Sequence, residues 1–229
     1  MVYVIAHNSP WCSNLSGQLE SKTSKNFVAI DNKKDLNRDH LNSINPEHIY
    51  FPHWSHIIPK DIYNNYECII FHMTDLPYGR GGSPLQNLIL MGKKNTKLTA
   101  FKCVKKLDSG PIYLKKKLSL DGSLEEIFSR ISILSEKMIF SIIRQKLKPR
   151  KQTGKVFNFK RRKPLHGNLK YARNINEIYN MIRMLDGQNY PKAFINFNNF
   201  ILKFSCAKKN KLDLQAKVQI IKKMGQTKS

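Results

Sequence analysis

Short apolar runs follow one another along the first half of the chain, separated by polar turns rich in Asn, Ser, Gly and Pro. Runs of this kind are typical of β-strands in a buried sheet. Two segments with wider apolar spacing, residues 35–44 and 84–91, are candidate helices, and Pro84 suits a first helical turn. The predicted strands cover residues 2–6, 26–30, 48–51, 67–71, 98–104 and 111–120.

The clearest predicted helix comes after these strands. Ser123 and Glu126 have the spacing of a capping box, in which each side chain satisfies a free backbone N–H of the other. Apolar residues then recur at helical spacing to about residue 146, which predicts a long helix with one face against the sheet. The shorter elements predicted beyond it are a helix over residues 174–185 and two hairpin strands over residues 193–197 and 201–206.

The alternation of strands and helices through residue 147 predicts an α/β fold. We expect a Rossmann-like twisted, mostly parallel sheet with flanking helices. At roughly 150 residues per domain, a chain of 229 residues corresponds to one domain with an appendage. We therefore predict a catalytic domain over residues 1–150 and a small basic α+β subdomain over residues 151–229. Ligands of such sheets bind beyond the carboxyl ends of the strands.

The chain is strongly basic, with 40 Lys and Arg against 16 Asp and Glu and a net charge of +24. Residues 148–229 hold 20 of these Lys and Arg but only three acids, Glu177, Asp186 and Asp213. Such a region suits an anionic partner, which can be nucleic acid, a phosphorylated small molecule or a lipid headgroup. The 31 Lys and 21 Asn equally fit the composition of an AT-rich genome, and no recognised nucleic-acid motif accompanies the charge.

Hydropathy and cysteine usage narrow the class of protein. The mean hydropathy is −0.47, and no apolar run approaches the roughly 20 residues of a membrane span, so no membrane partner is expected. The first residues predict a strand and not a signal peptide. The four cysteines are scattered, without a CxxC pair or zinc-type spacing. They predict buried thiols in a cytoplasmic protein without a structural metal.

Residues 71–84 combine a strand end, a histidine and a glycine-rich loop. His72 ends a predicted strand, and the following loop carries Arg80 and leads into a helix, whose free N–H groups favour anions. The loop lacks the GxGxxG and GxxxxGK[ST] fingerprints. Asp108, in a tight turn before a later strand, would meet His72 if the strands were neighbours. That pair would make a general base, although each residue alone is more often structural.

These motifs together resemble the folate-dependent formyltransferases. The resemblance implies an N-formyltransferase with 10-formyltetrahydrofolate as its co-substrate and no metal. It further implies that a primary amine attacks the formyl carbon while His72 handles the proton and Asp108 holds His72. The segments that carry it are His72, Leu76-Pro77-Tyr78-Gly79-Arg80-Gly81-Gly82-Ser83-Pro84, Asp108-Ser109-Gly110-Pro111-Ile112, and the pterin-loop-like His56-Ile57-Ile58-Pro59.

The chain departs from this family at one position. The family has Asn two residues before the histidine, where this chain has Ile70. The donor to the oxyanion would then come from Asn87, Thr74, Gln86 or a backbone N–H, and we take Asn87 as the third catalytic candidate. Without a replacement, the chain would be an inactive relative that still binds folate or RNA. The implied folate-binding residues are Trp54, Ile57, Ile58, Pro59 and Ser109, with Trp54 equally typical of a core or rim position.

The C-terminal region resembles the small tail of sugar N-formyltransferases, since it is short for the β-barrel of methionyl-tRNA formyltransferases. We therefore predict a nucleotide-linked amino sugar as acceptor, specifically a UDP-4-amino-2,4,6-trideoxy sugar, and no specific nucleic-acid partner. A methionyl-tRNA formyltransferase-like enzyme is the alternative, favoured by the basic tail. The apolar tail hairpin favours a homodimer. The predicted substrate-binding residues are Tyr78, Arg80, Gly81, Gly82 and Arg161.

Overall fold

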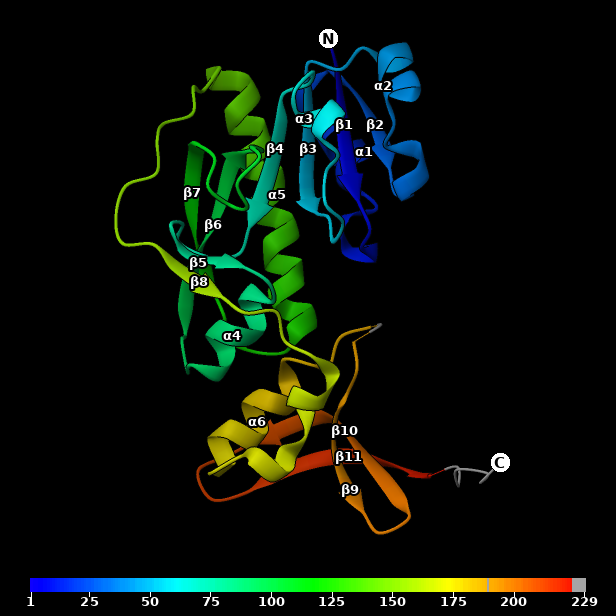
Figure 1. Cartoon of the computed structure of the whole chain (residues 1–229), viewed down its shortest axis with the longest axis vertical. Coiled ribbons are helices and arrows are strands. Elements are labelled where there is room, and N and C mark those ends of the chain that lie inside the picture. Colours follow the sequence, from blue (N-terminus) through cyan, green and yellow to red (C-terminus); the bar gives the residue numbers. More distant parts are fainter. Residues whose placement is uncertain (189, 224–229) are drawn as a thin grey trace.

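The computed structural model describes residues 1–188 and 190–223. Figure 1 shows two stacked parts, a large α/β part with the N-terminus at its far end and a small part built on a second sheet. The chain passes between them after the long helix α5, Leu124–Gln145, through an extended connection. No helix within these described residues is long and apolar enough to cross a membrane.

A six-stranded sheet with the order β2-β1-β3-β4-β6-β7 forms the centre of the large part. The first four strands of this order run parallel, whereas β6 is antiparallel to β4 and β7 is antiparallel to β6. The predicted Rossmann-like, mostly parallel α/β fold is therefore confirmed. The strands are β1 (Val2–His7), β2 (Asn26–Ile30), β3 (His48–His53), β4 (Cys68–His72), β6 (Asn95–Lys102) and β7 (Ile112–Ser119).

Helices cover both faces of this sheet and enclose two apolar clusters. On one face, α1 (Leu15–Thr23), α4 (Pro84–Leu90) and α5 pack on the larger cluster. On the other, α2 (Arg38–Ile44) and the short α3 (Lys60–Tyr63) pack on the smaller one. The α5 helix starts with the predicted capping box, in which the Ser123 hydroxyl accepts a hydrogen bond from Glu126 N at 3.2 Å.

The small part contains α6 (Ile175–Arg183) and a three-stranded antiparallel sheet with the order β11-β10-β9. Its strands are β9 (Ala193–Phe197), β10 (Phe200–Lys209) and β11 (Leu214–Lys222). The predicted helix and hairpin are present, while β11 is an addition. The α6 helix docks on the large part because Arg183 Nη1 donates to the carbonyl oxygens of Leu120, at 2.7 Å, and Gly122, at 2.9 Å.

The connection between the parts is not a free linker. Its strand β8 (Phe157–Phe159) pairs in parallel with β5 (Tyr78–Gly81), which lies in the loop after β4. Figure 1 shows this two-stranded ribbon lying across the end of the large part. The connection to the C-terminal region therefore packs against the loop that follows His72.

Candidate active site

His72 and Asp108 come together at one edge of the central sheet. His72 is the last residue of β4, and Asp108 lies in the turn between β6 and β7. Because β6 pairs antiparallel with β4, Thr99 lies opposite His72 and the end of β6 at Lys102 lies opposite Ile69. The turn after β6 carries Asp108 back to the loop that follows His72, where its Oδ2 accepts a hydrogen bond from the Gly81 N–H. The Nδ1 atom of His72 is 3.9 Å from Oδ2 of Asp108, and both side chains are only 10% exposed.

The protonation of the His72 ring follows from its second contact. Its Nε2 lies 2.7 Å from the carbonyl oxygen of Gly79. A carbonyl oxygen can only accept, so Nε2 carries the hydrogen and the neutral ring presents its lone pair at Nδ1. Once Nδ1 takes a proton, the nearby carboxylate of Asp108 stabilises the resulting imidazolium. The arrangement can therefore accept a proton at one defined atom.

Asp108 is itself held by its turn. The residue has a positive φ of 49°, and its Oδ2 accepts a hydrogen bond of 2.8 Å from the backbone N–H of Gly81. Ser109 Oγ closes the turn by donating to Lys106 O at 2.7 Å. A Cβ on Gly110 would lie 1.7 Å from the carbonyl oxygen of Lys102, so only glycine fits there. The turn thus fixes the carboxylate, and the Ser109 hydroxyl stabilises the turn. The predicted contact of Ser109 with folate stays a prediction.

The glycine-rich loop packs against the returning connection. Gly81 has a φ of 101°, and a Cβ on it would lie 2.4 Å from Phe159 O. A Cβ on Gly82 would meet the side chain of Arg161 at 2.7 Å. The chain itself fills the space beside both glycines, and their predicted substrate contacts stay predictions. Arg161 is exposed at this contact.

Two other predicted side chains are engaged within the protein. Arg80 is buried, and its Nη2 donates to Gln152 Oε1 at 2.7 Å, which turns the guanidinium away from the role of an exposed phosphate ligand. Tyr78 is half-buried and stacks on Phe157, with ring centroids 5.1 Å apart. The substrate contacts of Arg80 and Tyr78 stay predictions.

The side chain of Asn87 also has partners that the sequence does not reveal. Its Nδ2 donates to the carbonyl oxygens of Gly82, at 3.1 Å, and Lys160, at 3.2 Å. Both amide hydrogens therefore hold the loop and the connection, and the role of Asn87 as an oxyanion donor stays a prediction. Thr74 is fully buried and donates to Gly79 O at 3.3 Å. Ile70 is half-buried on the same face of β4 as His72, two residues away.

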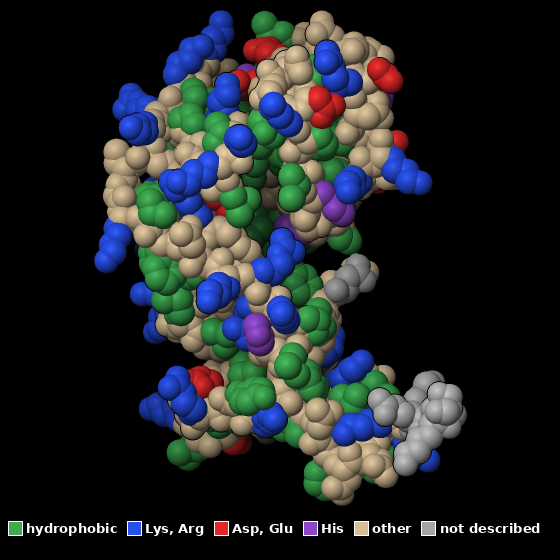
Figure 2. Space-filling model, in the orientation of Figure 1, with side chains coloured by type: hydrophobic (Ala, Val, Ile, Leu, Met, Phe, Trp, Pro, Cys, Tyr) green, Lys and Arg blue, Asp and Glu red, His purple; other side chains and the backbone are tan. Residues whose placement is uncertain are grey.

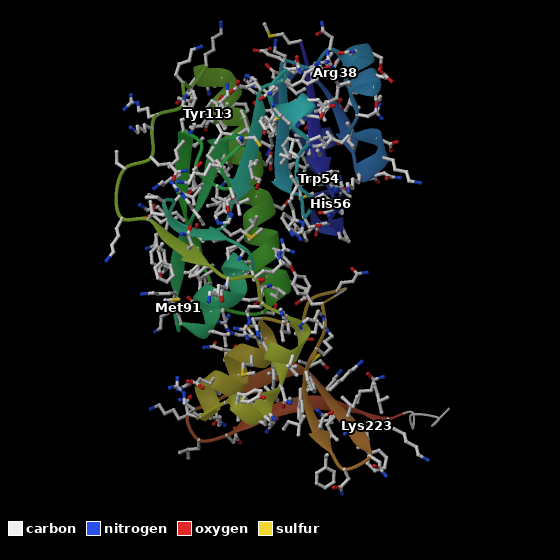
Figure 3. The ribbon with its side chains drawn as sticks, viewed as in Figure 1. Arg38, Trp54, His56, Met91, Tyr113 and Lys223 are labelled. Carbon is white, nitrogen blue, oxygen red and sulfur yellow. The ribbon has the colours of Figure 1, made fainter. Side chains whose placement is uncertain are left out.

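The loop after β3 starts at the same edge of the sheet as His72, because β3 is the parallel neighbour of β4. Figure 3 shows Trp54 and His56 close together there, and their ring centroids are 5.4 Å apart. Ile57 is 89% exposed, Ile58 is buried and Pro59 is exposed. The buried Nε1 of Trp54 has no partner among the described residues. The folate contacts of Trp54, Ile57, Ile58 and Pro59 stay predictions.

Sequence reasoning missed three residues at this edge. His7 and His53 end β1 and β3 and are paired in register, and Trp11 contacts the His53 ring edge-on at 5.1 Å. Burial, and next the neighbouring His7, lower the pKa of His53 to about 4. Burial also lowers the pKa of His7. The sequence signal for these residues was that His7, His53 and His72 each end a strand, and the three strands are neighbours in the sheet. No group of three or more His, Cys, Asp or Glu among the described residues could hold a metal.

The fold and this site define a class of enzymes that transfer one-carbon groups, and the family models agree. The Formyl transferase model matches residues 16–143, and the model of the methionyl-tRNA formyltransferase C-terminal domain matches residues 164–221. The chain belongs to the formyltransferase family. This confirms the predicted formyltransferase family.

Individual relatives refine this assignment. A structure described as methionyl-tRNA formyltransferase from Clostridium thermocellum is 43% identical, with a TM-score of 0.93, and the match covers 97% of this chain and 99% of that one. Methionyl-tRNA formyltransferase of Bacillus subtilis is 30% identical over 73% of this chain and 55% of its own length. The chain spans about half the length of the curated relatives it matches. A sugar N-formyltransferase from Shewanella is 15% identical, with a TM-score of 0.70 over 92% of this chain and 98% of that chain, which shows a shared fold only.

These similarities overturn two predictions. The acceptor prediction, a nucleotide-linked amino sugar, is wrong, and so is the prediction of no nucleic-acid partner, because the more similar relatives are named for methionyl-tRNA. The error came from the length of the C-terminal region. The Clostridium thermocellum structure is matched over 99% of its length, so a short C-terminal region does not separate the two branches.

Proposed function

We propose that this chain formylates the amino group of methionyl-tRNA. The observation that carries the proposal is the 43% identity to the Clostridium thermocellum structure over nearly the whole chain, which includes the small sheet. The match of residues 164–221 to the C-terminal domain model supports the same acceptor. In this proposal residues 1–150 carry the chemistry, the small part with α6 and the sheet of β9, β10 and β11 contacts the tRNA, and the protein is cytoplasmic.

The residues at the sheet edge suit an amine acceptor. When bound, 10-formyltetrahydrofolate supplies the formyl carbon, and the reaction joins that carbon to the amine nitrogen and breaks its bond to the folate nitrogen. His72 Nδ1 takes the proton that the amine must lose and can return it to the leaving nitrogen. Asp108 stabilises the charged ring in between. The loop from Trp54 to Pro59 would hold the pterin beside them.

The charge distribution supports a tRNA partner. Lysines on β10 and β11 such as Lys208, Lys209 and Lys217 are exposed, and Figure 2 shows Lys and Arg side chains on both parts of the molecule. Phosphate contacts release counterions, so tRNA affinity should fall steeply as salt rises. Binding measured at several salt concentrations should give a straight log–log dependence, shallower in a Lys208, Lys209 and Lys217 to Gln variant. A matched variant at the exposed Lys33 and Lys34 serves as the control.

The decisive experiment supplies purified protein with 10-formyltetrahydrofolate and methionine-charged initiator tRNA. Formylmethionine released from the tRNA is then quantified by mass spectrometry. We expect formylation of the charged tRNA and none of free methionine. No product with charged tRNA, in protein shown to bind folate, would contradict the proposal. It would favour an inactive relative, with Ile70 as the first position to restore to Asn.

A further inference from the structure

Gln152, in the connection after α5, joins three segments of the candidate site. Its Oε1 accepts a hydrogen bond from Arg80 Nη2 at 2.7 Å. Its Nε2 donates to the carbonyl oxygen of Asp108 at 2.9 Å and to that of Gly110 at 2.8 Å. The amide has one orientation that satisfies all three partners, because carbonyl oxygens need a donor and the guanidinium needs an acceptor.

These bonds hold Asp108 from the side opposite its carboxylate. The carboxylate is bound by the N–H of Gly81, while the carbonyl of the same residue is bound by Gln152. Asp108 has a positive φ of 49°, a left-handed conformation that aspartate adopts more readily than most non-glycine residues, so the backbone conformation alone does not fix the turn. The position of the carboxylate relative to His72 therefore depends on both contacts.

We infer that Gln152 is a positioning residue for the reaction, acting through the Asp108 turn to set the distance between the carboxylate and His72. The inference rests on the proposed function, since it assigns Gln152 a part in that activity. It also links the C-terminal region to the chemistry, because the connection that leads to the small sheet carries the side chain that orders the turn.

The backbone around Gln152 is held without its side chain. Arg150 and Ile112 exchange two backbone hydrogen bonds, of 2.7 and 2.8 Å, just before it. After it, β8 pairs with β5. A substitution at Gln152 should therefore leave the connection in place and remove only the three side-chain bonds. This allows positioning of Asp108 to be separated from folding.

The test compares three variants of the full chain in the formylation assay with charged initiator tRNA. Gln152→Met keeps the size but loses every bond. Gln152→Glu keeps the acceptor for Arg80 but places a carboxylate beside the carbonyl oxygens of Asp108 and Gly110, where it cannot donate a hydrogen bond. Thr153→Ala changes the exposed neighbour and is the control. We expect kcat to fall about 10- to 100-fold in both Gln152 variants with KM little changed, a loss like that seen when an outer-shell partner of a metal ligand is removed.

A spectroscopic readout tests the same inference without substrate. In protein labelled with 15N-histidine, the His72 ring signals, assigned by their loss in His72→Gln, should move in Gln152→Met and stay in place in Thr153→Ala. Wild-type kcat and unmoved His72 signals in Gln152→Met would overturn the inference. If Gln152→Glu keeps the wild-type kcat while Gln152→Met loses it, the loss comes from the bond to Arg80 and not from the Asp108 turn. That result would also overturn the inference. If Gln152→Met fails to fold, Gln152→Glu decides. An inactive wild-type protein would contradict the proposed function, while the signals would still test Gln152.

Discussion

The imidazole of His72 donates its Nε2–H to the carbonyl oxygen of Gly79 at 2.7 Å, and this bond determines which ring nitrogen can act as the base. Gly79 belongs to β5, which is paired with β8 of the C-terminal connection. The loop that orients the histidine is therefore ordered by a segment about 80 positions later in the chain. Nδ1, which lies beside Asp108, is therefore the ring nitrogen that accepts and releases a proton.

The first prediction concerns this pair. His72→Ala removes the base, and general acid–base catalysis typically contributes about 100- to 10,000-fold, so kcat should fall by that order. Asp108→Asn should also lower kcat, since a neutral amide cannot stabilise the imidazolium. The measurement is the initial rate of formylmethionyl-tRNA formation. Asp39→Asn, at an exposed aspartate of α2, should leave the rate unchanged. A fully active His72→Ala protein would remove this residue from the mechanism.

The second prediction concerns the turn that carries Asp108. Gly110→Ala would place a Cβ 1.7 Å from Lys102 O, so the turn must move and carry the carboxylate with it. We expect both a lower melting temperature and a loss of formylation. Gly17→Ala is the matched control, because a Cβ at this position in α1 meets nothing within 4 Å. It should be neutral or raise stability by about 0.5–1 kcal/mol through helix propensity. An unaltered Gly110→Ala protein would contradict the required close approach.

The regular elements of the fold were readable from the sequence because strong patterns coincide with burial. The helix after Ser123 combined a capping box with an uninterrupted apolar stripe. By contrast, α1 is not predicted, since only Leu15 and Leu19 of its nine residues are buried and the rest are polar or small. The strand β11 was missed because none of its residues is buried: Leu214 and Ala216 are half-buried, and Val218 and Ile220, on the same face, are exposed.

The candidate site was predictable only in part, because a segment distant in the sequence packs against the loop that follows His72. His72 and Asp108 were identifiable from spacing and from the order of motifs. The pairing of β5 with β8 depends on residues about 80 positions apart, and nothing local marks it. Whether Arg80 and Asn87 point to solvent or inward depends on that pairing. Both side chains turned out to bind the connection.

The third prediction is a dependence of stability on pH. The pKa of His53 is lowered from 6.5 to about 4 by burial and by His7, whose own pKa is also lowered by burial. The unfolded state therefore binds more protons between pH 4 and 6.5. The stabilisation is complete above pH 6.5 and is lost as pH falls toward 4, by at most on the order of 3 kcal/mol for His53.

Urea unfolding between pH 5 and 7 measures this effect. The carboxylates of Glu67 and Asp75 do not change their protonation in this pH range, because hydrogen bonds from lysines hold their pKa values below the ordinary 4.5 and 3.8. His53→Gln cannot be protonated, so the change of unfolding free energy with pH should become shallower. His56→Gln, at an exposed position, should keep the wild-type slope. Equal slopes in all three proteins would show that His53 is not a buried neutral group.

The fourth prediction concerns the contact between the two parts. Arg183 Nη1 on α6 donates to the carbonyl oxygens of Leu120 and Gly122, at 2.7 and 2.9 Å, where β7 leads into α5. Arg183→Ala leaves both carbonyls without this donor, which typically lowers the unfolding free energy by about 1–3 kcal/mol. The small part should also detach more often, so limited proteolysis should cut the connection faster. Arg173→Ala removes an ion pair with Glu177 in which the Arg173 side chain is 84% exposed, and it should change neither measurement. If proteolysis of the two variants proceeds equally fast, the docking of α6 does not depend on Arg183.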